Sequence, residues 1–238
     1  MSVDVKSPKR VKSQTSFYKS MWAIVWKDLR AESRGLQLIS AMLIFSLLVI
    51  LIFNFALELD ARERANVTSG VLWATFVFAG TLGLNRSMAV EKDRGCLDGL
   101  LLAPVDRSAI YFGKVIGNLI FMFLVEGITL VVYAVFYNNF GVFNPGLLSV
   151  ILLGSIGYAV VGTLLSSMAV HASTRDILLP ILLFPVALPV LISAVRASGY
   201  FLEGMEMSFI WPSINVLIAF DIIYIALAYM VFDFVVEE

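Results

Sequence analysis

Long apolar stretches alternate with short polar segments along almost the whole chain. The apolar stretches cover residues 36–57, 70–84 with a continuation towards 90, 109–137, 146–170, 177–194 and 211–232. An α-helix rises about 1.5 Å per residue, so about twenty apolar residues cross the hydrocarbon core of a bilayer, which is about 30 Å thick. The pattern therefore predicts an all-α, polytopic membrane protein with six transmembrane helices.

The polar segments between the predicted spans are all short. They are a charged loop at 58–69, the most polar segment at 91–107, a turn at 138–145, a turn at 171–176 and a mixed stretch at 196–210. The mixed stretch combines Gly and Glu with apolar residues, and we expect it to form a short, half-inserted element. Three prolines within 177–194 predict a kink or break in that helix. The small residues of 146–170 predict a helix at the centre of the bundle.

The N-terminal region differs from the spans. Residues 1–16 are polar, basic and rich in Ser, so we expect a flexible basic tail. Residues 17–35 place an apolar face at helical spacing, formed by Tyr18, Trp22, Val25, Trp26 and Leu29. An amphipathic elbow helix with Trp and basic residues is suited to lying in the headgroup region beside the transmembrane domain at 36–238. The alternative is a soluble helix that packs on another subunit.

Composition excludes several classes of protein. The 238 residues are 60% hydrophobic and 15% charged, whereas soluble domains average about 45–50% apolar and about 25% charged residues. This excludes an ordinary soluble enzyme and a disordered chain. The single cysteine, Cys96, cannot form an intramolecular disulfide. No P-loop, catalytic triad or zinc pattern occurs in the sequence, so we expect no enzyme activity, no metal site and no cofactor bound by a motif.

The net charge of −1 conceals an uneven distribution. Residues 1–35 hold eight basic and three acidic residues, whereas 36–238 hold nine basic and fifteen acidic residues. With the N-terminus in the cytoplasm, fourteen of the 17 Lys and Arg residues lie on the cytoplasmic side of the predicted spans. Cytoplasmic loops carry an excess of Lys and Arg, so we predict a multi-pass protein of the cell inner membrane with both termini in the cytoplasm. The basic tail does not predict a nucleic-acid partner, because no soluble domain follows it.

Segment 91–107 begins with four charged residues and continues, after a glycine, into a leucine-rich run that ends at Pro104. A short helix with leucines along one side can dock in a groove of a cytosolic partner. The alternative is a solvated connector, but its leucines would be unfavourably exposed to water. We therefore interpret 91–107 as a docking element, which we call the coupling segment.

Several segments carry a resemblance to a known family through their order and spacing. They are 26–32 (WKDLRAE), 76–91, 98–107 (DGLLLAPVDR), 109–114 (AIYFGK) and the proline-rich 179–185 (LPILLFP). The layout resembles the membrane subunits of ABC-2-type exporters. More narrowly, it resembles the haem exporter B permease family of the bacterial cytochrome c maturation system. The resemblance spans nearly all of residues 20–235 and leaves out the basic tail.

The resemblance implies the membrane permease subunit of an ABC-type haem transporter complex in cytochrome c-type biogenesis. It implies an ABC ATPase partner that hydrolyses ATP, haem-handling membrane subunits, a periplasmic haem chaperone and a homodimeric arrangement in membrane lipid. Haem is then either the exported cargo, or ATP hydrolysis releases a haem-loaded chaperone. Two other interpretations stay open: an ABC-2-type exporter of a lipid, drug or glycan, and a non-transporting assembly scaffold.

Three groups of residues are candidates for function. Contacts with the ATPase are expected from Glu91, Asp93, Asp98, Leu101 and Pro104. Glu126 and Asp221 lie near the middle of predicted spans, where an ionised carboxylate costs about 3 kcal/mol on insertion scales. They either line a transport path or contact another subunit, or each is a protonated acid in a purely structural hydrogen bond. His171 is the candidate haem contact, since histidine ligates haem iron, although a lone histidine at a helix end more often caps that helix.

Overall fold

A computed structural model describes residues 16–56, 61–93, 95, 96, 99, 105–170, 172 and 174–235. Within these residues the chain forms α-helices and one short 3₁₀ helix, and no strand occurs in them. The helices are α1 (Phe17–Ser33), α2 (Gln37–Ala56), α3 (Ala61–Asp93), α5 (Arg107–Tyr137), η1 (Phe140–Phe143), α6 (Pro145–Ala169), α7 (Arg175–Leu202) and α8 (Met207–Val235). The prediction of an all-α protein is confirmed for the described part of the chain.

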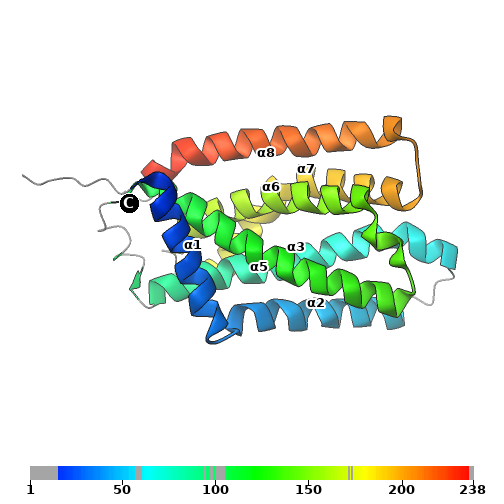
Figure 1. Ribbon diagram of the computed structural model, residues 1–238, viewed down its shortest axis with the longest axis horizontal. Coiled ribbons are helices and arrows are strands. Elements are labelled where there is room, and N and C mark those ends of the chain that lie inside the picture. Colours follow the sequence, from blue (N-terminus) through cyan, green and yellow to red (C-terminus); the bar gives the residue numbers. More distant parts are fainter. Residues whose placement is uncertain are drawn as a thin grey trace, which may run out of the picture.

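Six of these helices are long and apolar enough to cross a membrane, namely α2, α3, α5, α6, α7 and α8. They run side by side as one bundle, and α1 lies across one end of it (Figure 1). We call this end the elbow end; α3 and α6 finish there, and α5 and α7 begin there. The prediction of six transmembrane helices with an N-terminal helix at one end is therefore confirmed.

The helix α1 packs on α5 through the side that carries Ser20, Ile24 and Val25. Ile24 and Val25 are buried, whereas Tyr18, Trp22 and Trp26 are 75%, 59% and 62% exposed. The face predicted for these five positions is thus divided, because Val25 turns into the protein while the aromatic residues point outwards. Large aromatic side chains that face away from the bundle are suited to the membrane interface, so the packing agrees with an interfacial helix.

The turn from α1 to α2 is held by a side chain of α1. One oxygen of Glu32, Oε1, accepts hydrogen bonds from the backbone N–H groups of Leu38 and Ile39 at 2.7 and 2.9 Å. These N–H groups belong to the first turn of α2, where the helix itself offers them no acceptor. The contact fixes the angle at which the first span leaves the elbow helix.

Two predicted loops are wrong in part. The charged loop at 58–69 becomes helical from Ala61, so α3 starts about two turns before the predicted span. No Gly or Pro interrupts 61–69, and the hydroxyl of Thr68 hydrogen-bonds that of Tyr133 at 2.8 Å. Likewise, the mixed stretch at 196–210 is not a half-inserted element: α7 continues to Leu202, and α8 begins at Met207 after a tight turn with Gly204 at φ +67°. The three prolines of α7 lie inside this helix without ending it.

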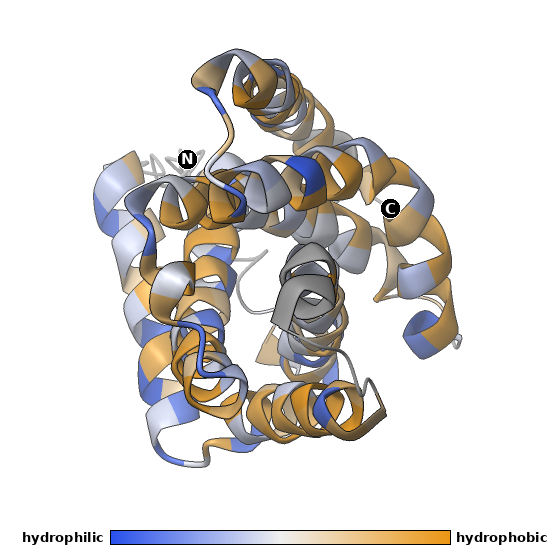
Figure 2. Ribbon diagram, turned by 90° about the vertical axis from the view of Figure 1, so that its right-hand side faces the viewer, coloured by the Kyte–Doolittle hydropathy of each residue, from blue (hydrophilic) through white to orange (hydrophobic). Residues whose placement is uncertain are grey.

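The bundle is built around α3 and α6. In each of these two helices, 72% of the 18-residue apolar stretch that could cross the membrane is buried inside the protein. The corresponding share is 22% for α2 and 28% for α8. Hydrophobic residues run along the peripheral helices (Figure 2), and large apolar side chains there, such as Ile52 of α2 and Ile222 of α8, are exposed on the outside of the bundle. Gly154 of α6 faces the ring of Trp73, whose indole N–H donates to Ser198 Oγ at 2.9 Å. The central position predicted for the helix rich in small residues is confirmed.

Replacing Gly154 by Leu is expected to destabilise the protein by about 2 kcal/mol, because the new side chain would overlap the Trp73 ring in a close-packed core. Thermal unfolding in detergent would measure the loss. Gly127→Leu is the matched control, since a Cβ at that position meets no atom within 4 Å. Equal melting temperatures for the two variants would contradict the close packing of α6 on α3.

Candidate functional site

The last turn of α3 places three charged residues, Glu91, Lys92 and Asp93, directly before the segment that connects α3 to α5. Consecutive residues of a helix point about 100° apart, so their three side chains reach different neighbours. We call these three residues and the groups they contact the α3 junction. It lies at the elbow end of the bundle.

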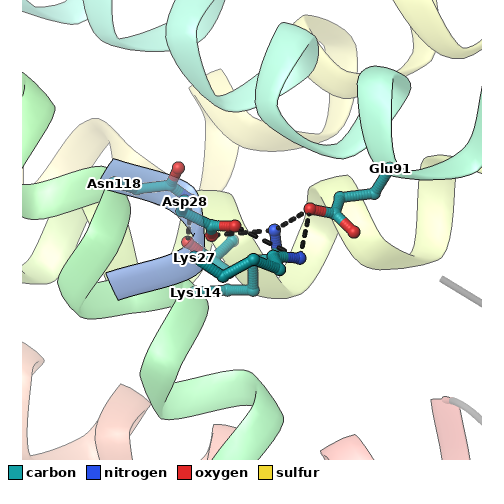
Figure 3. Close-up of polar contacts among 6 residues, drawn as sticks. Lys27, Asp28, Glu91, Lys114 and Asn118 are labelled. Atoms are coloured by element: carbon teal, nitrogen blue, oxygen red, sulfur yellow. Dashed lines mark hydrogen bonds and ion pairs between the residues drawn. The ribbon is translucent and has the colours of Figure 1, made fainter. Parts of the chain in front are cut away.

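Glu91 joins α3 to α1 and α5. Its Oε1 accepts hydrogen bonds from Lys27 Nζ at 2.6 Å and from Lys114 Nζ at 2.8 Å. Asp28 lies beside the same two ammonium groups, 2.8 Å from Lys114 and 3.3 Å from Lys27 (Figure 3). Two lysines and two carboxylates therefore form a closed, neutral cluster that ties three helices together.

Three of the four members are largely removed from solvent, whereas the side chain of Lys27 is 38% exposed. Lys114 is 2% exposed and Glu91 is 8% exposed. Burial alone would lower the pKa of Lys27, but the neighbouring Asp28 and Glu91 carboxylates outweigh burial and raise that pKa above its ordinary value. Buried charges are stable only when they are paired and hydrogen-bonded. Removing one charge of the cluster is therefore expected to destabilise the charges that remain.

Two glycines of α5 allow α1 to approach closely enough for these contacts. A Cβ at Gly113 would stand 3.0 Å from Ile24 and from the carbonyl oxygen of Met21, and a Cβ at Gly117 would stand 3.5 Å from Asp28 Oδ2. The two glycines are four residues apart and lie on one face of α5. The two glycines leave this face of α5 without side chains, and the elbow helix packs directly against it.

Lys92 and Asp93 join α3 to the other side of the bundle. Lys92 Nζ donates to the carbonyl oxygen of Val170 at 2.8 Å, where α6 ends and its dipole favours a cation. Arg175, the first residue of α7, donates two hydrogen bonds to the Asp93 carboxylate at 3.1 and 3.0 Å. Earlier on α3, Asn85 donates to Asp176 at 2.9 Å. The end of α3 is therefore fixed to four helices: α1, α5, α6 and α7.

The structure places the predicted coupling residues unequally. Glu91 and Asp93 both belong to the α3 junction, where Glu91 is turned into the protein and Asp93 is exposed. Asp98, Leu101 and Pro104 lie outside the described residues, as do His171 and the tail at 1–15. The prediction of ATPase contacts from these residues stays a prediction.

Besides Lys92, which lies within the predicted coupling segment but was not singled out, sequence reasoning missed four charged members of the junction: Lys27, Asp28, Lys114 and Arg175. Lys114 carried a usable signal, because it is a charge inside a long apolar stretch, and such charges mark paired or functional positions. The other three lie in polar segments, where nothing local distinguishes a paired charge from a solvated one.

The two intramembrane carboxylates both pack against the central helix α6. Glu126 Oε1 accepts a hydrogen bond from Ser155 Oγ at 2.7 Å, and its Oε2 has no partner among the described residues. Asp221, on α8, lies against the backbone of Gly157, and its Oδ1 likewise has no partner among the described residues. Both side chains are buried. No cluster of three or more His, Cys, Asp or Glu side chains that could hold a metal ion occurs in the described part of the chain.

Comparisons with known proteins agree with one another. The model of the family described as CcmB protein matches residues 19–237. A Heme exporter protein B from Rhodobacter capsulatus is 28% identical over 191 residues, which cover 79% of this chain and 86% of that protein. Proteins of the same name from Paracoccus denitrificans and Pseudomonas aeruginosa are each 24% identical, covering 74% and 70% of this chain and 81% and 74% of those proteins.

Proposed function

The chain belongs to the CcmB protein family, and from this premise we propose that it is the membrane permease subunit of an ABC-type haem transporter complex in cytochrome c-type biogenesis. The relatives named Heme exporter protein B support haem as the cargo. In this proposal the chain is not an enzyme. A separate ABC ATPase hydrolyses ATP, and the chain converts movement of that partner into movement of its own helices.

The α3 junction is the observation that carries this proposal. Segment 94–106 begins at a helix end that is tied through three consecutive residues to α1, α5, α6 and α7. A displacement of this segment by a partner would therefore act at once on α1 and α5 and, on the other side of α3, on α6 and α7. Coupling between distant sites travels through such contiguous networks of packed and hydrogen-bonded groups.

The elbow end faces the cytoplasm in this proposal, and the protein lies in the inner membrane. Fourteen of the 17 Lys and Arg residues belong to the N-terminal region or to the parts of the sequence around the helix ends that meet there. This agrees with the excess of basic residues in cytoplasmic segments. Both termini are then cytoplasmic, and the ATPase docks from the same side.

Within this arrangement, the predicted coupling residues have two different roles. Asp98, Leu101 and Pro104 contact the ATPase directly, whereas Glu91 and Asp93 pass the movement on through the α3 junction. The complex is completed by haem-handling membrane subunits, a periplasmic haem chaperone and a second copy of this chain. ATP hydrolysis drives either haem export or the release of the haem-loaded chaperone. Glu126 and Asp221 provide polar groups along the path through the membrane, and His171 is retained as the candidate haem contact.

Substitutions in the coupling segment test the proposed docking. Leu101→Asp and Asp98→Lys are each expected to lower holo-cytochrome c by about tenfold, because they place a wrong charge in the contact with the ATPase. Membrane insertion should be unchanged. The matched controls are Met205→Asp and Glu203→Lys, in the exposed turn at the opposite end of the bundle. Normal cytochrome c levels in both coupling-segment variants would contradict the docking.

The cargo is tested separately. A strain that lacks this chain is expected to lose holo-cytochrome c while its apocytochromes are still made and exported. Full cytochrome c together with a defect in the secretion of a lipid, drug or glycan would contradict haem as the cargo and would favour a different ABC-2-type exporter.

A further inference from the structure

The connection between α5 and α6 lies at the end of the bundle opposite the elbow end, which we call the far end (Figure 1). It consists of residues 138–144 and contains the 3₁₀ helix η1. None of residues 127–170 is Asp, Glu, Lys or Arg, whereas the two other connections at the far end, 57–60 and 203–206, each contain two acidic residues. The connection therefore differs from its neighbours in having no charged group that would keep it in water.

Two phenylalanines of η1 are exposed. Phe140 is 64% and Phe143 is 41% exposed, whereas Val142 between them is buried. Residues i and i+3 of a 3₁₀ helix lie on the same side, because this helix has three residues per turn. The two rings therefore extend from one side of η1, while Val142 packs into the bundle. Val135 and Phe136, in the last turn of α5, are exposed as well and continue the apolar surface along the chain.

The backbone of this connection is partly satisfied by its own asparagines. Asn139 Oδ1 accepts a hydrogen bond from the Gly141 N–H at 3.1 Å, and Asn144 Oδ1 accepts one from the Gly146 N–H at 2.8 Å. Pro145, the first residue of α6, has no N–H that needs a partner. Backbone groups without partners keep irregular chain segments out of lipid. The asparagine caps thus lower the cost of bringing this connection into the membrane surface.

The level of the connection follows from the packing of α6 on α7. Gly146, in the first turn of α6, lies so close to the ring of Phe201 that a Cβ at this position would overlap the ring. Phe201 is the last residue but one of α7, and the acidic turn 203–206 follows directly. The connection is therefore level with the end of a membrane-crossing helix, where the hydrocarbon core gives way to the headgroups.

We propose that η1 is a membrane anchor whose occupant is lipid: the rings of Phe140 and Phe143 insert among the phospholipid headgroups at the far end and contact the upper acyl chains. Two membrane-crossing helices lead directly into η1, and amphipathic segments with Phe at this level bury their apolar side in the interface. In water the two rings would remain hydrated at an unfavourable free energy. The proposal is independent of the transport function and of its cargo.

Spin-label accessibility of the full-length protein in phosphatidylcholine nanodiscs tests the anchor. Cys96→Ser gives a cysteine-free parent, because Cys96 is the only cysteine. The label is then attached through Phe143→Cys, through Ile52→Cys as the lipid reference on exposed α2, or through Glu203→Cys as the water reference. Oxygen partitions into lipid, whereas a water-soluble nickel complex stays outside. We expect the ratio of the oxygen to the nickel collision rate at 143 to lie clearly above that at 203 and below that at 52.

A charged residue in η1 separates the rings from their surroundings. Phe140→Asp, made in the labelled Phe143→Cys protein, is expected to draw η1 into water and to lower the ratio at 143 to that at 203. The melting temperature should be nearly unchanged, because Phe140 is exposed. Met205→Asp is the matched control: it adds the same charge to an exposed apolar position at the far end and should leave the ratio at 143 unchanged.

Four results would overturn the proposal. A ratio at 143 equal to that at 203 would place η1 in water. Low collision rates with both reagents would show that protein, such as a second copy of this chain, covers the rings. An unchanged ratio in Phe140→Asp would show that the helices alone set the level of η1. An equal fall in Met205→Asp would show a general effect of charge at the far end.

Discussion

Replacing Lys114 by Met is expected to destabilise the folded protein by about 3–5 kcal/mol, which is the usual cost of removing one partner of a buried ion pair. Lys114 is 2% exposed and lies 2.8 Å from both Asp28 and Glu91. Its removal leaves two buried carboxylates with Lys27 as their one remaining cation in the cluster. Thermal unfolding in detergent, together with the monodisperse fraction after purification, would measure the effect.

Two further variants make this prediction specific. Lys19→Met removes the same charge from an exposed position of α1 and is expected to leave stability within about 0.5 kcal/mol of the parent protein. Combining Lys114→Met with Glu91→Met should recover most of the lost stability, because Lys27 and Asp28 then remain as a balanced pair. A Lys114→Met protein that melts with the Lys19→Met control would contradict the buried cluster.

Replacing Asp93 by Arg is expected to lower holo-cytochrome c by about fiftyfold while changing the melting temperature little. The pair with Arg175 is partly exposed, and exposed pairs contribute less than about 1 kcal/mol to stability. The functional loss is larger because two arginines at this position repel each other and release the last turn of α3 from Arg175 at the start of α7. Coupling free energies between sites are typically 1–3 kcal/mol, or about five- to 150-fold. Assays of holo-cytochrome c against the amount of inserted protein would measure the ratio.

The exchanged pair decides whether contact or charge is responsible. Asp93→Arg combined with Arg175→Asp restores the bridge with its polarity reversed, and we expect it to recover most of the cytochrome c. Glu206→Arg, which makes the same charge change in the turn at the opposite end of the bundle, should have no effect. Failure of the exchanged pair to recover function, or normal function in Asp93→Arg alone, would show that the α3–α7 contact does not transmit movement.

Local pattern predicted the membrane-crossing helices well but their ends poorly. Six apolar stretches became six helices, and the small residues of 146–170 became a central helix. The loop at 58–69 was wrong from residue 61 onwards, and the half-inserted element at 196–210 was wrong, because polar residues end the apolar stretch without ending the helix. Polar residues are compatible with a helical backbone, so a helix can continue past the bilayer surface, as α7 does up to the turn that contains Gly204.

The candidate site could be predicted only in outline. Glu91 and Asp93 were identified from the charged start of the coupling segment, and both belong to the α3 junction. That Glu91 is buried and Asp93 is exposed could not be predicted from neighbouring positions in the chain. Glu91 turns towards a helix that begins earlier in the sequence, and Asp93 turns towards one that begins 82 residues later.

The sequence by itself determined the class of the protein, its six spans, its elbow helix and the family it resembles. Whether a stretch can cross the membrane depends mainly on its own length and hydrophobicity, so the order of apolar and polar residues along the chain is sufficient to predict the spans. The tertiary structure alone decided which charges meet. Lys27 and Glu91 are 64 positions apart and Lys92 and Val170 are 78 apart, and hydrogen bonds of less than 3 Å exist only once the packing of α1, α3, α5 and α6 has brought these groups together.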